Sequence, residues 1–237
     1  MWCVIIPVYN NHSTIRDVIT DVMKYTSDII VVNDGSCDGT REILQSMLVT
    51  LVDYSSNRGK GYALKQGFMK AKEEGYDFAV TIDADGQHFA DDISLFIKAH
   101  DENPESLIVG CRNLNKEGMP GKNTFANKFS NFWFYVQTGI RLSDTQTGFR
   151  MYPLNMLNSN FWWLTSRYEA ELELLVYSAW QGIDIQSVNI QVNYFPEGGR
   201  ISHFRPIYDF VRISVLNTIL CLLTIFYAIP LKILRLK

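Results

Sequence analysis

Three oxygen-bearing side chains stand at alternate positions after an apolar run near residue 80. They are Asp83, Asp85 and Gln87, and the run before them, residues 78–82, reads Phe-Ala-Val-Thr-Ile. Alternate side chains of an extended chain share one face. Two carboxylates and an amide oxygen on one face are donors that Mg²⁺ or Mn²⁺ uses together with substrate phosphates. The spacing therefore predicts a hard-cation site, and an acidic turn between a strand and a helix is the alternative.

Two further polar clusters follow apolar runs. Residues 29–32, Ile-Ile-Val-Val, lead into residues 33–36, Asn-Asp-Gly-Ser, where Asp34 can accept hydrogen bonds from a nucleobase or a ribose. The same residues are strong turn formers, so an Asx-turn is the alternative. Lys60 stands between two glycines, whose backbone can approach a phosphate while the ammonium supplies the counter-charge. The loop matches neither the P-loop nor the GxGxxG pattern, which disfavours an ATPase or a Rossmann dehydrogenase.

The elements that must position these clusters alternate between strand and helix. Strands are predicted at the apolar runs 3–8, 29–32, 49–54, 78–82 and 106–110, and helices at 14–25, from 38 or 40 to 47, and at 62–74. Such alternation forms βαβ units on a mostly parallel sheet, and ligands bind at the carboxyl ends of its strands. We therefore expect an α/β fold in which the polar clusters meet along one edge of the sheet.

Together these segments resemble the family 2 glycosyltransferases, which have the GT-A fold. The resemblance rests on ordered blocks: VIIPVYNN at 4–11, IIVVNDGSCDGT at 29–40, NRGKGYALKQGF at 57–68, TIDADGQH at 81–88, GCR at 110–112 and DTQTGFRMY at 144–152. The form Asp-Ala-Asp-x-Gln-His is most similar to the dolichol- and polyprenol-phosphate mannose synthase-like branch. The resemblance implies a Rossmann-like, mostly parallel sheet flanked by helices.

The resemblance also implies a nucleoside-diphosphate sugar as donor, carrying GDP or UDP, and Mg²⁺ or Mn²⁺ as cofactor. Asp34 would contact the base or ribose, Asp83 and Asp85 would meet the diphosphate through the metal, and Gln87 would join the metal shell. His88 is assigned a structural role. The donor-binding candidates are Pro7, Tyr9, Asn10, Asp34, Lys60, Asp83 and Arg112, and the metal candidates are Asp83, Asp85 and Gln87.

Arginines further along the chain are suited to phosphate. Arg150 lies in the block at 144–150, which lines the sugar and acceptor pocket of the resembling family, and a guanidinium donates two parallel hydrogen bonds to phosphate. The alternative for either arginine is a structural ion pair, and Arg112 is as well suited to phosphate as to such a pair. The candidates for binding the acceptor or the diphosphate are Arg150, Arg200, Ser202 and His203, of which His203 has no counterpart in the branch pattern.

Two carboxylates open a predicted helix where many members of the resembling family carry the catalytic base. Glu169 and Glu171 are two positions apart and point to different sides of a helix, so we expect at most one to face the pocket. Solvated acids in a first helical turn are the alternative. With Asp85 and Arg150, these two glutamates are the catalytic candidates.

Two apolar segments follow the sheet edge. The aromatic run 125–136 predicts a helix whose Phe129, Trp133 and Val136 form a buried face. Residues 213–231 carry no charged side chain, and this uncharged run just reaches the length needed to span a bilayer. Helices lying in the membrane interface, with cations at anionic headgroups, and a helix packed on a soluble core are the alternatives. We expect a GT-A domain over 1–199 and a membrane-associating tail over 200–237.

Composition and charge narrow the class of protein. The net charge of −3 argues against a general nucleic-acid binder, whereas residues 200–237 hold six Lys or Arg and one Asp. The four cysteines are scattered without a Cys-x-x-Cys pair, which indicates reduced thiols. The chain opens on a strand-like run without a signal peptide. We therefore expect attachment to the cytoplasmic face of the cell membrane through the tail.

The leading hypothesis is an inverting, metal-dependent transfer of a hexose from a nucleoside-diphosphate sugar to a polyprenyl phosphate. A phosphate monoester has a second pKa of about 6 and is already an anion at neutral pH, so it needs no strong base. The second hypothesis is transfer to a hydroxyl of a glycan or glycolipid in cell-envelope polysaccharide synthesis, where Glu169 or Glu171 must take the proton. The third is a catalytically inactive scaffold that binds nucleotide sugars.

Overall fold

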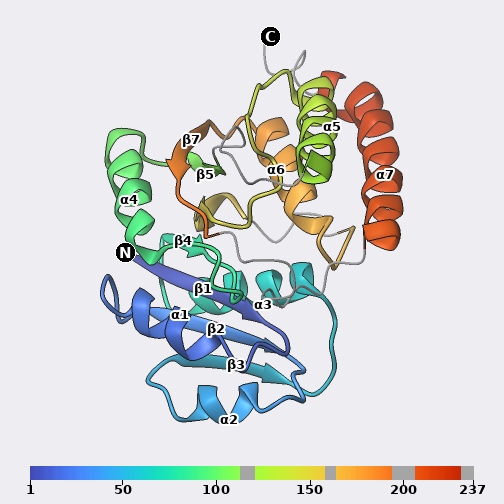
Figure 1. Ribbon diagram of the computed structural model, residues 1–237. Coiled ribbons are helices and arrows are strands. Elements are labelled where there is room, and N and C mark those ends of the chain that lie inside the picture. The colour runs from blue at the N-terminus through green and yellow to red at the C-terminus, as the bar shows by residue number, and fades with distance from the viewer. Residues whose placement is uncertain (113–120, 158–163, 194–205, 231–237) are drawn as a thin grey trace.

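A computed structural model describes residues 1–112, 121–157, 164–193 and 206–230 of the 237-residue chain. In that part the chain forms one seven-stranded sheet with helices packed on it (Figure 1). The strands are β1 (Trp2–Val8), β2 (Ile29–Asp34), β3 (Thr50–Tyr54), β4 (Phe78–Thr81), β5 (Leu107–Arg112), β6 (Arg150–Pro153) and β7 (Ile185–Ile190). The helices are α1 (Ile15–Val22), α2 (Thr40–Gln45), α3 (Lys60–Glu73), α4 (Ile93–Glu102), α5 (Gly121–Thr138), α6 (Ala170–Trp180) and α7 (Pro206–Leu223), and Thr224–Ala228 continues α7 as a π-helical turn.

The sheet is mostly parallel, as predicted. Its strand order is β3-β2-β1-β4-β6-β5-β7, and only β6 runs against its neighbours. The predicted strands and helices of residues 1–110 are all present, with ends that differ by a few residues. The strand β6 was not predicted, because residues 150–153 read only as part of a chemical block. Its pairing with β4 places Arg150 opposite Thr81, at the edge where β4 ends.

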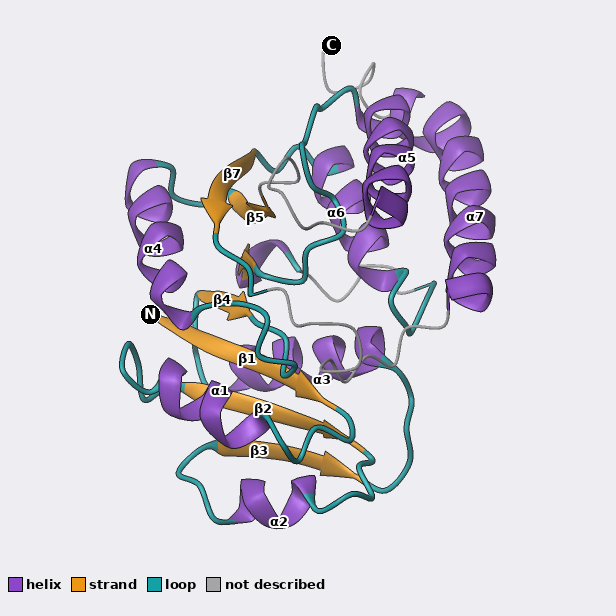
Figure 2. Cartoon of the chain, in the orientation of Figure 1, coloured by secondary structure: helices purple, strands orange, loops and turns teal. Residues whose placement is uncertain are grey.

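The strands are buried on both faces, which is why they read as continuous apolar runs. In β1, Cys3 and Ile5 pack on one side of the sheet, whereas Val4 and Ile6 pack on the other. Helices α1, α2 and α4 cover the second side, and α3, α6 and α7 cover the first. Figure 2 shows the resulting layers, with the orange strands between purple helices. The carboxyl ends of β1, β2 and β4 consequently open into the same region.

The apolar tail forms a long helix that packs on the domain. Helix α7 begins at Pro206 and contacts α5 and α6, with Leu216 and Leu220 buried in the core. Residues Tyr208–Ala228 are long and apolar enough to cross a membrane, by length and composition. The predicted apolar C-terminal helix is therefore present, while a domain boundary at residue 200 stays a prediction.

We predict that Gly67→Ala destabilises the protein, although the same change in most helices stabilises them by about 0.5–1 kcal/mol. Gly67 lies in α3, and an added Cβ would be 2.5 Å from Ile5 Cγ2 and 3.2 Å from Val32 Cγ2. The overlap should cost about 1–3 kcal/mol of unfolding free energy, measured by urea denaturation. A variant as stable as the wild type would contradict this packing of α3 on β1 and β2.

Candidate active site

Lys60, the first residue of α3, lies between two carboxylates. Its Nζ is 2.6 Å from Asp83 Oδ1 and 2.9 Å from Glu171 Oε2. Burial by itself would lower the pKa of Lys60, but the two carboxylates outweigh it and raise that pKa above its ordinary value. The ammonium is therefore charged at neutral pH. It joins the start of α3, the end of β4 and the start of α6.

Gly148 forms the wall behind this ion cluster. A Cβ at this position would lie 2.6 Å from Lys60 Nζ and 2.8 Å from Asp83 Oδ2, so a larger residue would displace the charged ends of these two side chains. The carbonyl of Gly148 accepts a hydrogen bond of 2.7 Å from Thr81 Oγ1, which fixes the loop beside β4. Sequence reasoning did not single out Gly148. Its position in the block at 144–152 was the one available signal.

The carboxylates of α6 are buried, which excludes the alternative that they are solvated acids. Glu171 faces Lys60, and burial raises the pKa of Glu171 although Lys60 opposes that change. Glu169 is also buried, and its Oε2 has no hydrogen-bond partner among the described residues. Glu173 accepts hydrogen bonds from the backbone nitrogens of Leu164 and Thr165, so it holds the segment that leads into α6.

Residues 83–88 turn back instead of continuing β4. Residues 84–85 form a turn, Gly86 has a φ of 73°, and the Gln87 nitrogen donates a hydrogen bond of 3.1 Å to Asp85 Oδ1. The premise that Asp83, Asp85 and Gln87 share one face of an extended chain is therefore wrong. The turn instead leaves all three residues partly exposed at the end of β4.

The donor set of this turn fits a metal that is shared with substrate. Among the residues that the structure describes, no group of three or more His, Cys, Asp or Glu could hold a metal ion by itself. Mg²⁺ is commonly held by one or two carboxylates together with substrate phosphates and water. Asp83 and Asp85 can supply those carboxylates, and Gln87 can supply an amide oxygen. The residues present therefore fit a divalent cation that arrives with a diphosphate.

The Asp34 carboxylate organises the loop that leads to Lys60. It accepts hydrogen bonds from the Arg58 nitrogen at 2.7 Å, the Gly59 nitrogen at 2.8 Å and Asn57 Nδ2 at 2.9 Å. The turn after β2 is made by its neighbour, because Asn33 Oδ1 accepts from the Ser36 nitrogen. Asp34 is buried in this arrangement, so its contact with a base or ribose stays a prediction.

The loop after β1 is tied to the loop after β2. The Asn10 nitrogen donates to Ser36 Oγ, and Asn10 Oδ1 accepts from the Cys37 nitrogen, both at 2.9 Å. Pro7 lies in β1 beside Val32 of β2, one position before the strand ends. The predicted donor contacts of Pro7, Tyr9 and Asn10 thus lie on the same sheet edge as Asp34.

Both predicted phosphate arginines are engaged within the protein. Arg112 forms a two-point ion pair with Asp144, with Nε 2.6 Å from Oδ2 and Nη2 2.9 Å from Oδ1. Arg150 is fully buried and donates from Nε to the Thr147 carbonyl, from Nη1 to the Glu171 carbonyl and from Nη2 to the Thr145 carbonyl. A phosphate contact by either arginine stays a prediction, and one by Arg150 would require this network to open.

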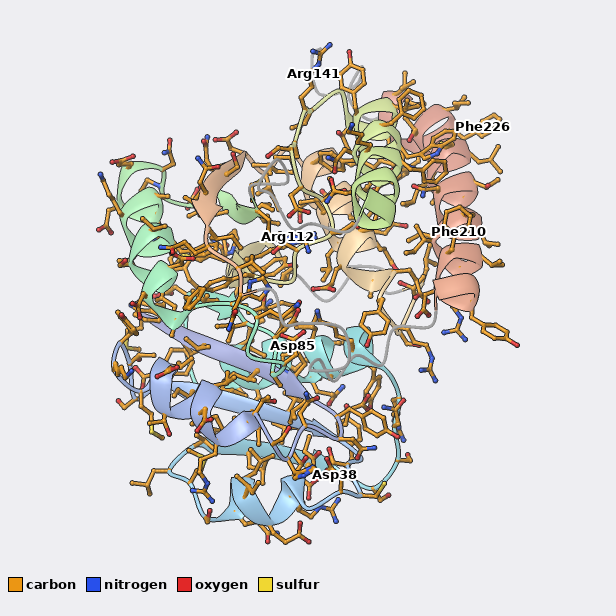
Figure 3. The ribbon with its side chains drawn as sticks, viewed as in Figure 1. Asp38, Asp85, Arg112, Arg141, Phe210 and Phe226 are labelled. Atoms are coloured by element: carbon orange, nitrogen blue, oxygen red, sulfur yellow. The ribbon has the colours of Figure 1, made fainter. Side chains whose placement is uncertain are left out.

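In Figure 3, Asp85 and Arg112 both lie in the middle of the molecule, between strands β1–β3 and helices α5 and α6. The remaining acceptor candidates, Arg200, Ser202 and His203, lie outside the described residues. The described part therefore brings together Lys60, Asp83 and Glu171 directly, with Asp85 on the adjoining turn.

Comparison with known families supports the resemblance. A family model described as glycosyl transferase family 2 matches residues 3–167. A UDP-N-acetylglucosamine–dolichyl-phosphate N-acetylglucosaminyltransferase of Methanococcus voltae is 30% identical over 214 residues, which cover 80% of this chain and 84% of the relative. A polyprenol monophosphomannose synthase of Mycolicibacterium smegmatis is 28% identical over 165 residues, covering 65% of this chain and 62% of that protein.

Solved structures show the same fold. Glucosyl-3-phosphoglycerate synthase from Mycobacterium tuberculosis, in complex with Mn²⁺, UDP and phosphoglyceric acid, superposes with a TM-score of 0.68. The superposition covers 96% of this chain and 78% of that chain at 19% sequence identity. A form of the same enzyme with Mg²⁺ and UDP gives a TM-score of 0.62. The predicted GT-A architecture is therefore confirmed.

We predict that His88 makes the protein less stable in mild acid. Its side chain is buried against Phe149, and burial lowers the pKa of His88 from 6.5 to about 4. Between these values the unfolded chain binds a proton that the folded chain does not, so stability falls as the pH drops below 6.5. The full loss is about 3 kcal/mol near pH 4.

The check is urea denaturation of the wild type and His88→Asn across this pH range. The variant should lose less stability than the wild type on acidification, because its side chain cannot be protonated. Equal pH dependence in the two proteins would show that groups other than His88 control the acid response.

Proposed function

The chain belongs to glycosyl transferase family 2 and is a glycosyltransferase that uses a nucleotide sugar, and we propose that its acceptor is a polyprenyl phosphate. The reaction would transfer a hexose or a related sugar from a GDP- or UDP-linked donor, with inversion at the anomeric carbon. Relatives named for transfer to dolichyl phosphate and for polyprenol monophosphomannose synthesis support this choice. We place the reaction at the cytoplasmic face of the cell membrane, with attachment through the C-terminal segment.

The observation that carries the proposal is the ion cluster of Lys60, Asp83 and Glu171. It places one ammonium at the edge where β1, β2 and β4 end, where ligands of open α/β sheets bind. A departing nucleoside diphosphate develops negative charge, and a cation fixed in advance stabilises that charge without reorganising at the moment of reaction. Lys60 is the residue that we expect to meet the diphosphate.

The carboxylates around Lys60 have distinct tasks in this proposal. Glu171 holds the ammonium from the α6 side, so that Lys60 stays ordered when a diphosphate approaches. Asp83 engages Lys60 through Oδ1 and, with Asp85, faces the metal and donor side. When bound, a divalent metal would supply further neutralisation of the diphosphate charge. Gly148 keeps the space behind the cluster clear for these groups.

The acceptor in this proposal brings its own nucleophile. A phosphate oxygen that is already anionic attacks the anomeric carbon on the face opposite the diphosphate, which inverts the configuration. No protein group has to remove a proton. The ion pair between Glu171 and Lys60 fits such a reaction, because it leaves Glu171 paired with a cation and less available as a base.

A hydroxyl acceptor is the second candidate, and one observation favours it. Glu169 is buried and its Oε2 has no hydrogen-bond partner in the described part of the chain, so this carboxylate could serve as a general base. The envelope-glycan alternative therefore depends on Glu169 rather than on Glu171.

Glu169→Gln separates the two acceptors. With a polyprenyl phosphate as acceptor, we expect turnover within about threefold of the wild type, because general base catalysis, typically worth about 10²–10⁴, is not used. Product formation is measured by mass spectrometry with membrane lipid extract and a panel of GDP- and UDP-sugars. A loss of a hundredfold or more would assign the acceptor to the hydroxyl class.

The metal assignment is tested by titration of UDP and GDP with and without Mn²⁺ in a calorimeter. We expect one of the two nucleotides to bind about tenfold more tightly with Mn²⁺, since the metal would be held by the carboxylates and would neutralise the diphosphate charge. Asp85→Asn should abolish the gain. Asp91→Asn is the matched control, because Asp91 is exposed and hydrogen-bonded to Tyr25. If the wild type binds both nucleotides with the same affinity in the presence and absence of Mn²⁺, the metal assignment is overturned.

A further inference from the structure

Helices α5 and α7 lie side by side and run in the same direction on the outer side of the molecule, away from α2 and β3 (Figure 1). Two contacts fix their relative position. The rings of Phe129 and Phe210 have centroids 5.8 Å apart, and Gln137 Nε2 donates to Asn217 Oδ1 at 3.0 Å. The inner side of α7 is thus packed against the rest of the protein.

The opposite side of α7 carries a continuous apolar stripe. Its residues are spaced by three or four positions, which places them on one face of the helix. Their exposed fractions range from 40 to 76%, and Figure 3 shows Phe226 projecting away from the body of the protein. The stripe consists of Tyr208, Val211, Val215, Ile219, Leu222 and Phe226.

Helix α5 extends this surface. Phe132, Tyr135 and Val136 are exposed on α5, at spacings that place them on one side of the helix. The sequence predicted Val136 on a buried face, and that prediction is wrong, because α5 packs on α6 and α7 and leaves the side that carries Val136 exposed. Apolar surface that continues over two helices marks an interface with a protein or a membrane.

The charges around the α5–α7 face have one sign. The exposed ionic side chains described on α5, α7 and the turn after α5 are Lys128, Arg141 and Arg212, while Asp209 is buried. Arg141 lies over the ring of Tyr135, with its Cζ 5.1 Å from the centroid. Lys232, Arg235 and Lys237 follow in the sequence. Apolar surface edged by cations matches the interface of a bilayer with anionic headgroups, whereas a second copy would bring like charges together.

We propose that the α5–α7 face docks onto an anionic bilayer with α7 lying in the plane of the interface. If α7 crossed the membrane, its inner side would lie among lipid chains, or α5 and α6 would have to enter the membrane with it. That side carries the buried Asn217 amide, whose Oδ1 accepts from Gln137 of α5, and the Gln137 carbonyl accepts from Trp180 Nε1 of α6. Helix α6 carries the buried Glu171 and Glu173, with the buried Glu169 at its N-cap, and carboxylates are costly in hydrocarbon.

The same helix α5 reaches the site from its inner side. Asn127 Nδ2 donates to Asp144 Oδ1 at 2.6 Å, and Ser130 Oγ accepts from Thr145 Oγ1 at 2.8 Å. Docking through its outer side therefore places α5 between the lipid surface and the loop at 144–148. This deepens the proposed function and rests on it in one respect: the acceptor phosphate then enters from the α5 side.

The proposal is tested with the full chain and vesicles of phosphatidylcholine, with or without phosphatidylglycerol, that contain no polyprenyl phosphate and no nucleotide. We expect binding that needs phosphatidylglycerol and falls about tenfold in Val136→Asp and in Val215→Asp, because each places a charge on the docking face. Leu48→Asp is the control and should bind like the wild type. Leu48 lies between α2 and β3, and it is 91% exposed.

Each other outcome contradicts the proposal. Undiminished binding of Val136→Asp would exclude α5 from the face. A dimer that dissociates in that variant, with vesicle binding unchanged, would assign the face to a second copy. Nitroxide labels at 211, 219 and 226 should report one depth, whereas a spanning helix would separate the outer two by about 22 Å.

Calorimetric titration of UDP and GDP with Mn²⁺ separates this proposal from the proposed function. The charge variants should bind nucleotide like the wild type, because neither residue is near the ion cluster. Vesicle binding without any nucleotide binding would overturn the proposed function and leave the docking face in place.

Discussion

The structure depends on one partly buried ion cluster, in which the Lys60 ammonium is shared by Asp83 and Glu171. Removing three charges from water is costly, and such clusters contribute little to net stability even when they are well paired. Its arrangement nevertheless determines much of the surrounding chain. Asp34 shapes the loop that delivers Lys60, and Gly148 provides the space that the ion pair needs. In the proposed function, this cluster is a charge arrangement held in place for a diphosphate.

Much of the fold could be predicted because parallel strands buried on both faces leave a strong apolar signal. The runs before Asn33 and Asp83 were recognised in this way, and the family blocks supplied the rest of the site. The signal failed where long-range contacts decide the structure. Strand β6 exists because it pairs with β4, some seventy positions earlier in the chain. The turn at 84–86 follows from a backbone conformation that no periodicity describes.

The arginines show the same limit at the level of single side chains. Composition makes a guanidinium in a phosphate-binding family a candidate ligand, yet Arg150 donates to three backbone carbonyls and Arg112 to one carboxylate. These partners lie up to 32 positions away in the sequence. Their geometry holds the loop at 144–148 against both α5 and α6. A sequence reports which groups can bind phosphate, and only the fold reports which of them are already occupied.

The antiparallel strand β6 divides the sheet into two parts that can change independently of each other during evolution. Strands β1–β4 and their loops carry the donor candidates Tyr9, Asn10, Asp34 and Lys60, whereas the segments after β5 carry the groups assigned to the acceptor. Because β6 pairs with both β4 and β5, the backbone ladder there does not depend on which side chains face the substrate. Under the proposed function, selection can thus change the recipient of the sugar by altering the later segments while the half that carries the donor candidates is inherited unchanged. One scaffold can in this way give rise to enzymes that share a donor and differ in product.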